Sequence, residues 1–367
     1  MMDPRIIRLR GTLAPEEPGA RGIERVARNP DCLRLRALTI VGIKPATAVK
    51  ILGGVDREGQ SPFALTLGQR FERQLIKNGA ANLLALYRDQ RHLTVAEAKV
   101  ADIGELAPGS GAAARRRRER ETRRALEAKL RGDPLAPNLI IKPRLTVSLV
   151  GVSHPIEPDY LVAADGEAFY RVGEIKSYPD RGGKTDQSDI RSACRQAAVG
   201  VIGLRQILDQ LAVTNSEHLA VAEADLVLRV TGLFLPTLHR QSIKGEIDSV
   251  LRAIADAPTN LDELDAMLPH GVSLDNPAVL RSVPNHYRPS CKEHCGLWEQ
   301  CRGQALAARH PIVLGDLAAE KLAAASSVDR ALDLVNSTGA PPRNAAEAAL
   351  GEELRAADTL LRRAIGQ

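Results

Sequence analysis

The stretch EPDYLVAADGEAFYRVGEIKSY, residues 157–178, carries the clearest structural signal in this chain. Its two runs, 159–165 and 168–178, are rich in β-branched and aromatic residues, as strands are. The Asp-Gly-Glu segment 165–167 between them is typical of a hairpin turn. The stretch therefore predicts two successive antiparallel strands joined by a tight turn.

Three side chains of this hairpin are expected to converge. Side chains two residues apart on a strand share a face, so Glu174 and Lys176 project together. Pairing through the turn brings Asp159 opposite the neighbourhood of Glu174. The sequence thus predicts two carboxylates and an ammonium group at one place.

Such a group has a chemical use and a plainer alternative. Mg²⁺ prefers oxygen ligands and often takes one or two protein carboxylates together with water and phosphate. A metal held in this way lowers the pKa of a bound water, and a lysine beside it offsets charge on a phosphate. The alternative is that Glu174 and Lys176 form a surface pair and Asp159 is a turn residue.

The flanking sequence predicts a mixed α/β core. Segment 66–89 spaces apolar residues as an amphipathic helix, 139–152 is strand-like, and 224–235 predicts one more strand. Segment 186–212 keeps a helical apolar stripe for six turns, made of Ile190, Cys194, Ala197, Val201, Leu204, Leu208 and Leu211. The remainder is predicted to be helical. This order indicates a central sheet flanked by helices, with a helical C-terminal part.

The positive charge is concentrated in segment 114–131. It holds nine arginine or lysine residues against three glutamates, whereas the whole chain has a net charge of +5. Such a helix can contact phosphates, or it can simply be a solvated surface. The first residues have no apolar core typical of a secretory signal, and no apolar run is long enough for a bilayer. We therefore expect a cytoplasmic protein without membrane contact.

Cysteines cluster near the C-terminal end. Cys291, Cys295 and Cys301 lie within eleven positions of one another. In a reducing compartment this grouping favours metal binding or catalysis over disulfides. Three thiolates do not complete a tetrahedral metal site, so a fourth ligand is expected from elsewhere in the chain. Cys194, on the apolar stripe of its helix, is expected to be a small core residue instead.

The segments PDYL (158–161) and GEIK (173–176) resemble the PD-(D/E)xK nuclease superfamily in its RecB-like branch. The resemblance implies a restriction-endonuclease-like core, in which Asp159 and Glu174 bind Mg²⁺ or Mn²⁺ and Lys176 serves catalysis. It covers roughly residues 25–305 as a pattern of motifs.

Two further family positions are matched in part. The helix after the hairpin usually carries a glutamine followed four residues later by a tyrosine, and this chain has Gln196 but Gly200. An earlier helix of the family has a glycine followed by an acidic residue or histidine near the metal, and LGQRFE supplies Gly68 and Glu72. By resemblance, Gln196 orients the substrate or the lysine, and Glu72 is a third metal ligand.

The cysteines match a subset of the same branch. CRISPR-associated adaptation exonucleases and AddB-type nuclease domains hold a [4Fe–4S] cluster with one cysteine before the nuclease core and three after it. The resemblance implies the ligands Cys32, Cys291, Cys295 and Cys301. The spacing here is C-x3-C-x5-C, whereas C-x2-C-x5-C is usual. A Cys₄ set also suits zinc, which remains the alternative.

The chain is accordingly expected to have four parts. They are an N-terminal segment 1–65, a nuclease core 66–240, a helical region 241–310 with the cysteines, and an alanine-rich tail 311–367. The expected function is a metal-dependent DNA nuclease, an exonuclease on single strands or ends, with protein partners in a repair or defence complex. The alternative is a nucleic-acid-binding or assembly subunit without turnover that has a structural zinc or iron–sulfur site.

Overall fold

The computed structural model describes residues 3–17, 19–55, 62–90, 98–109, 111–163, 167–336 and 340–366. The chain divides into two compact units. Unit 1 comprises residues 1–30, 36–44 and 59–274, and unit 2 comprises residues 31–35, 45–58 and 275–367. Helix α3 (Leu33–Val41) begins in unit 2 and ends in unit 1.

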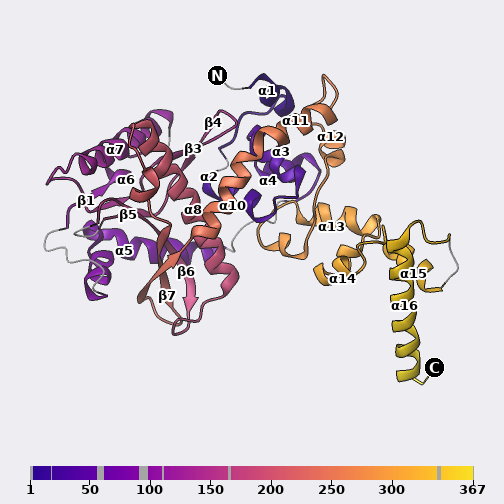
Figure 1. Cartoon of the computed structure of the whole chain (residues 1–367). Coiled ribbons are helices and arrows are strands. Elements are labelled where there is room, and N and C mark those ends of the chain that lie inside the picture. Colours follow the sequence, from indigo (N-terminus) through magenta and orange to yellow (C-terminus); the bar gives the residue numbers. More distant parts are fainter. Residues whose placement is uncertain are drawn as a thin grey trace. The chain divides into compact units, whose positions relative to one another are not determined.

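Unit 1 is built on a six-stranded mixed sheet flanked by helices (Figure 1). The strand order is β1-β2-β5-β6-β7-β8, in which only the β1–β2 and β6–β7 pairs are parallel. The strands are β1 (Val100–Asp102), β2 (Leu139–Ile141), β5 (Tyr160–Val162), β6 (Arg171–Asp180), β7 (Glu223–Val230) and β8 (Pro236–Ser242). The predicted α/β class with a mixed central sheet is therefore confirmed.

The two faces of the sheet are covered by different helices. Helix α5 (Pro62–Asp89) packs Phe71 and Leu75 in one core cluster with Ile175 of β6. Val172 of β6, on the opposite face by alternation, lies against Gly200 of α8 (Gln187–Gln210). Glu174 and Lys176 follow Val172 at intervals of two residues. Their side chains therefore lie on the same face of β6 as Val172, away from the core cluster under α5.

Helix α8 approaches the sheet unusually closely. A Cβ atom at Gly200 would lie 3.1 Å from Val172 Cγ1 and 3.2 Å from Pro158 Cγ. One at Gly203 would lie 2.6 Å from Ile156 Cδ1. The side of α8 that carries a tyrosine in the resembling family therefore has no room for one here.

Several element boundaries differ from the prediction. The expected strand 139–152 is divided into β2 and a separate hairpin, β3 (Leu145–Leu149) with β4 (Val152–Ile156). Lys142 before Pro143 ends β2 with a positive φ of 51°, and Val150 and Gly151, both with positive φ, turn β3 into β4. The turn expected at 165–167 falls largely outside the described residues.

The strand predicted over 224–235 is present as β7 but ends earlier, and the helices predicted beyond it begin only at residue 244, because the missed strand β8 comes first. β7 ends at Val230, Gly232 turns the chain with a φ of 77°, and β8 returns antiparallel. The sequence of β8, PTLHRQS, has too few apolar residues to signal a strand, because it lies at the sheet edge and buries mainly Leu238. The helix predicted over 66–89 is present as α5, with an interruption at Lys77–Ala80.

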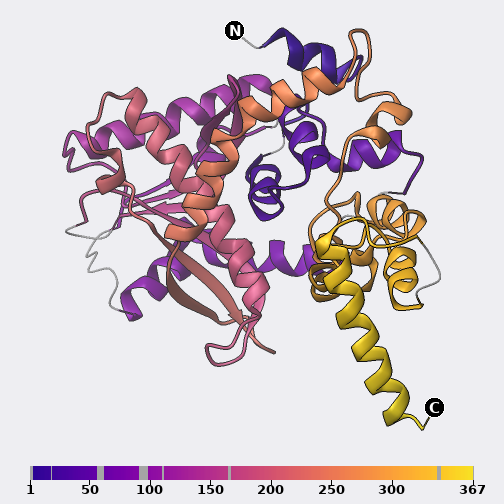
Figure 2. The same ribbon diagram turned by 45° about the vertical axis from the view of Figure 1, so that its right-hand side comes forward.

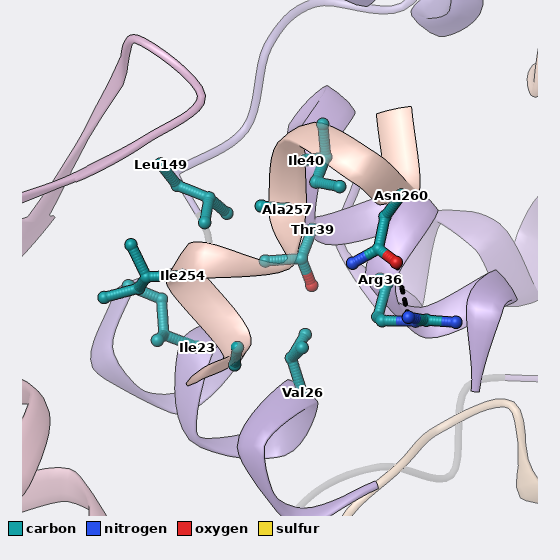
Figure 3. A pocket seen from close by; sticks show the side chains of 10 residues that line it. Ile23, Val26, Arg36, Thr39, Ile40, Leu149, Ile254, Ala257 and Asn260 are labelled. Atoms are coloured by element: carbon teal, nitrogen blue, oxygen red, sulfur yellow. Dashed lines mark hydrogen bonds between the residues drawn. The ribbon is translucent and has the colours of Figure 1, made fainter. Parts of the chain in front are cut away.

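The remaining helices of unit 1 are α1 (Pro4–Arg10), α2 (Gly19–Arg28), α6 (Ile103–Leu106), α7 (Ala112–Leu130), α9 (Ser216–Leu219), α10 (Lys244–Ala255) and α11 (Ala257–Met267). Figure 3 shows α2, α3, α10 and α11 meeting around a small apolar void, with Arg36 donating a hydrogen bond to Asn260. The void measures about 10 Å³, hardly the space of one water, so it is a packing gap rather than a ligand site.

A buried histidine makes unit 1 sensitive to acid. His154 of β4 is 1% exposed, and its Nε2 has no hydrogen-bond partner in the described part of the chain. Burial lowers the pKa of His154 from 6.5 to about 4. As the pH falls, the unfolded chain therefore takes up a proton on His154 before the folded chain does. The folding free energy is undiminished above the pKa of the unfolded chain, and it decreases as the pH drops towards the pKa of the folded chain.

We expect this effect to cost up to about 3 kcal/mol of folding free energy in acid. Urea unfolding at neutral pH and at about pH 5 measures it. The His154→Leu variant should lose less stability on acidification than the wild type. Equal losses in both proteins would show that other groups carry the acid sensitivity.

Unit 2 is helical. Its elements are α4 (Pro45–Ile51), α12 (Pro277–Ser282), η1 (Pro289–Glu293), α13 (Trp298–Ala307), η2 (Pro311–Leu314), α14 (Asp316–Lys321), α15 (Val328–Asn336) and α16 (Ala345–Ala364). Helices α15 and α16 lie side by side near the C-terminus (Figure 2). They pair through a small core that contains Leu334 and Leu350, beside a buried Arg330–Glu347 ion pair of 2.7 Å. Among the described residues, no helix is long and apolar enough to span a membrane.

Candidate active site and cysteine cluster

The β5–β6 hairpin brings Asp159, Glu174 and Lys176 together, and we call these three residues the hairpin site. Lys176 Nζ lies 2.6 Å from Glu174 Oε2 and 3.8 Å from Asp159 Oδ2. Asp159 Oδ2 also accepts a 2.7 Å hydrogen bond from the backbone N–H of Ile175. The convergence expected from the strand alternation is therefore present, with both carboxylates on the same ammonium group.

The hairpin site is buried, and its charges are strongly coupled. Glu174 is 5% exposed, and burial raises its pKa to about 7, with Lys176 opposing the shift and Asp159 adding to it. Burial alone lowers the pKa of Lys176, but Glu174 and Asp159 outweigh it, so the net shift is upward. At neutral pH the site therefore holds a charged lysine beside a glutamate that exchanges its proton easily.

Lys142 is a second lysine of the site, and the sequence reading missed it. Its ammonium group pairs with Glu72 of α5 and lies 3.4 Å from Asp159 Oδ1. Its backbone N–H donates to the Asp159 carbonyl at 3.0 Å. Lys142 has a positive φ, which is uncommon for a residue other than glycine, and nothing in the local sequence signalled its place in the site.

The donor set suits a hard divalent cation. Glu72, Asp159 and Glu174 supply carboxylate oxygens, and Lys142 and Lys176 neutralise them where a metal ion would otherwise do so. Across the described ranges, no three or more His, Cys, Asp or Glu side chains are already arranged to hold a metal. In this structure Lys142 pairs with two of the three carboxylates, Glu72 and Asp159.

Gln196 lies on the correct side of the sheet but is not bonded to the hairpin site. It precedes Gly200 by one helical turn and so shares the α8 surface that faces Val172. Among the described residues, no hydrogen bond or ion pair joins it to Asp159, Glu174 or Lys176. Gly68 of α5 lies near the same strand, since a Cβ atom there would be 3.5 Å from Ser177 Oγ.

The glycine of GEIK is required by packing. Gly173 pairs with Tyr160, and a Cβ atom at Gly173 would lie 2.0 Å from Tyr160 Cζ. We expect Gly173→Ala to cost about 1–3 kcal/mol, because the buried Tyr160 ring must shift. Thermal melting of the purified variant measures this, with Gly245→Ala, in the helix 244–255, as a comparison that meets no atom within 4 Å and has no positive φ. An unchanged melting temperature for Gly173→Ala would contradict the packing argument.

Four of the five cysteines lie in unit 2. Cys32, Cys291, Cys295 and Cys301 are buried there, whereas Cys194 is buried in α8 of unit 1. Burial, together with the nearby Cys301, Cys32 and Cys291, raises the pKa of Cys295 to about 12. The distant Cys32 thus joins the three C-terminal cysteines as a neighbour.

Arg34 is a buried cationic side chain beside these cysteines. It is 1% exposed and donates to the carbonyls of Val283 and Arg281, to Gln304 Oε1 and, at 3.5 Å, to Cys301 Sγ. No carboxylate pairs with it in the part of the chain that the structure describes. A buried guanidinium without a carboxylate needs other negative charge nearby, which metal-bound thiolates supply.

Backbone N–H groups also point at the sulfurs. The N–H of Arg288 donates to Cys291 Sγ at 3.4 Å, and the N–H of Leu297 favours the thiolate of Cys295. Hydrogen bonds to sulfur are one of the means by which proteins tune iron–sulfur clusters. The four cysteines are thus buried neighbours with N–H donors near two of their sulfurs, but among the described residues they are not arranged as a metal-holding group.

Compared with known proteins, the chain matches no protein-family model and no curated protein.

Proposed function

We propose that this chain is a divalent-metal-dependent DNA nuclease with a restriction-endonuclease-like core of the RecB-like branch. The observation that carries the proposal is the convergence of Asp159, Glu174 and Lys176 from adjacent strands, within 3.8 Å of one ammonium nitrogen. A mixed sheet covered by α5 and α8 suits that core. Perturbed titratable groups gathered at one place favour a catalytic site over a surface pair.

In this proposal Glu72, Asp159 and Glu174 hold Mg²⁺ or Mn²⁺. The bound ion supplies an activated water and polarises the phosphodiester. Glu174 must lose its proton to bind the ion, and its pKa of about 7 makes this easy at neutral pH. Because the pKa of Lys176 is raised, Lys176 stays an ammonium that donates hydrogen bonds to the attacking water or the phosphate and does not act as a base.

Cationic side chains at two places suit a nucleic-acid backbone. On α7, Arg116, Arg117 and Arg120 are exposed and have no ionic partner in the described ranges. Nearer the hairpin site, Tyr178 lies within electrostatic reach of both Lys176 and Arg21 of α2. Phosphates bind such surfaces with a strong dependence on salt. We further propose that the nuclease acts on single strands or on strand ends, and that its substrate is DNA.

The cysteines are proposed to hold a structural [4Fe–4S] cluster, with zinc as the alternative. Cys32 and Cys291 are 259 positions apart in the chain, so the centre closes a very long loop. The entropic cost of closing a loop grows only slowly with its length, so closing this long loop costs little more free energy than closing a shorter one. Anaerobic purification distinguishes the two metals, since only an iron–sulfur protein is brown and releases acid-labile sulfide.

A binding or assembly subunit without turnover is the second candidate. It is favoured by Gly200 in place of the aromatic residue and by the ion pairs of Lys142 with Glu72 and Asp159. Such a protein would bind DNA in a salt-sensitive way and cleave nothing.

One experiment separates the two candidates. End-labelled linear single-stranded, linear double-stranded and circular DNA are incubated with the pure protein and with Mg²⁺, Mn²⁺ or EDTA. The proposal expects cleavage with either ion and none with EDTA, and loss of activity on circles would assign an exonuclease. Salt-dependent binding of the same substrates without cleavage under any ion would select the binding subunit.

A further inference from the structure

Unit 2 contains a polar cavity of about 760 Å³. Its walls come from α12 and the segment after it, from α13, and from η2 and α14. This volume is within the range of small-molecule pockets, about 300–1,000 Å³. Arg34, which donates to Cys301 Sγ, also lies in the lining, so the cavity adjoins the four cysteines.

One part of the lining is cationic. Arg281 and Arg288 contribute guanidinium groups, each with only part of its hydrogen-bonding capacity used: Arg281 on the Leu52 carbonyl and Arg288 on Asp31 at 2.9 Å. An arginine fork with free N–H groups is the usual partner of a phosphate.

Two histidines, His286 and His310, also lie in the lining. His310 Nδ1 accepts the N–H of Ile312 at 3.2 Å, which leaves Nε2 as the ring nitrogen that can donate. Burial and the nearby Arg288 lower the pKa of His286. His310 thus adds an imidazole donor beside the arginines.

The same lining holds an aromatic ring and two carboxylates. Tyr287 is half-buried in the wall, whereas Tyr87, Tyr160 and Tyr170 belong to the core of unit 1. Asp316 and Glu320 are exposed on α14. An aromatic face stacks with a base, and carboxylates accept hydrogen bonds from sugar hydroxyls or base amino groups.

This mixture of groups excludes a simple polyanion as the ligand. Two carboxylates in the lining repel a chain of several phosphates, whereas the arginines attract a single phosphate group. A nucleotide has one phosphate, one base and one sugar, and thus one partner for each kind of group in the cavity.

We propose that this cavity binds a nucleoside monophosphate unit, either a free mononucleotide or the phosphorylated end of a strand. The phosphate lies on Arg281 and Arg288, the base on Tyr287, and the sugar or base amino groups face Asp316 and Glu320. The assignment does not depend on cleavage at the hairpin site.

Isothermal titration calorimetry on the full-length protein tests the proposal. The ligands are dTMP, dAMP, thymidine, inorganic phosphate, and one short oligonucleotide with and without a 5′-phosphate, all without divalent metal to prevent turnover. We expect saturable binding of the mononucleotides and weaker binding of thymidine and phosphate. Binding of only the phosphorylated oligonucleotide would assign the strand end as the natural ligand.

Variants locate the ligand. Tyr287→Ala and Arg281→Ala should each weaken mononucleotide binding at least about tenfold, which is about 1.4 kcal/mol. The matched control is Arg302→Ala, an exposed arginine of α13 outside the lining, which should bind as the wild type does. Thermal melting checks that each variant is folded. The proposal is overturned if no ligand binds, or if folded Tyr287→Ala and Arg281→Ala both retain wild-type affinity.

Discussion

Glu174→Gln is expected to lower the rate of metal-dependent DNA cleavage by at least about 10³-fold, or about 4 kcal/mol of transition-state stabilisation. The amide keeps the size of the side chain and its contact with Lys176, but it has no negative charge. In the proposed nuclease, Glu174 is the most buried carboxylate of the ion site, at 5% exposure. A neutral oxygen at that position leaves the ion weakly held and the two lysines in excess.

The measurement is the initial rate on linear DNA at saturating Mg²⁺ and at saturating Mn²⁺. The matched control is Glu223→Gln, at the start of β7, where the carboxylate is 46% exposed and lies 3.9 Å from Arg240. That variant should cleave at the wild-type rate. Wild-type cleavage by pure, folded Glu174→Gln would remove the hairpin site from the mechanism.

The sequence predicted the hairpin site because strand alternation is a local rule. Glu174 and Lys176 share a face for geometric reasons alone, and a short turn then determines which residues oppose them. The same local reasoning predicted α8, whose buried stripe includes Val201 and Leu204, and the burial of Cys194.

Lys142 and Arg34 were missed for a different reason. Lys142 reaches Glu72, 70 positions earlier, and Arg34 lies against Cys301, 267 positions later. No period or spacing in one sequence encodes such pairings. Edge strand β8 was missed because it buries little, so its composition carries no strand pattern.

A similar long-range network supports the sheet beneath the hairpin site. Asp225 of β7 is completely buried, and its Oδ2 accepts hydrogen bonds from Arg171 Nε at 2.8 Å and from the Tyr87 hydroxyl at 2.9 Å. Its Oδ1 lies 3.3 Å from Arg240 Nε. The Tyr87 hydroxyl also bonds that of Tyr160 at 2.9 Å, so one carboxylate links α5 to four neighbouring strands.

Asp225→Ala is therefore expected to destabilise unit 1 by about 3–5 kcal/mol, the usual cost of removing one partner from a buried ion pair. Arg171, 5% exposed, would keep only Glu167 as a charged partner, and the Tyr87 hydroxyl would lose an acceptor. Urea unfolding followed by far-ultraviolet circular dichroism measures the change, because the sheet lies in unit 1 while Trp298, the single tryptophan, lies in unit 2.

The control and a double variant make this prediction specific. Glu223→Ala removes an exposed carboxylate from the same strand and should cost less than about 1 kcal/mol. Asp225→Leu combined with Arg171→Leu should be less destabilised than the sum of the two single variants, because neither charge then remains buried alone. If Asp225→Ala unfolds at the same urea concentration as Glu223→Ala, the network contributes little and the apolar contacts between α5 and β6 hold the sheet by themselves.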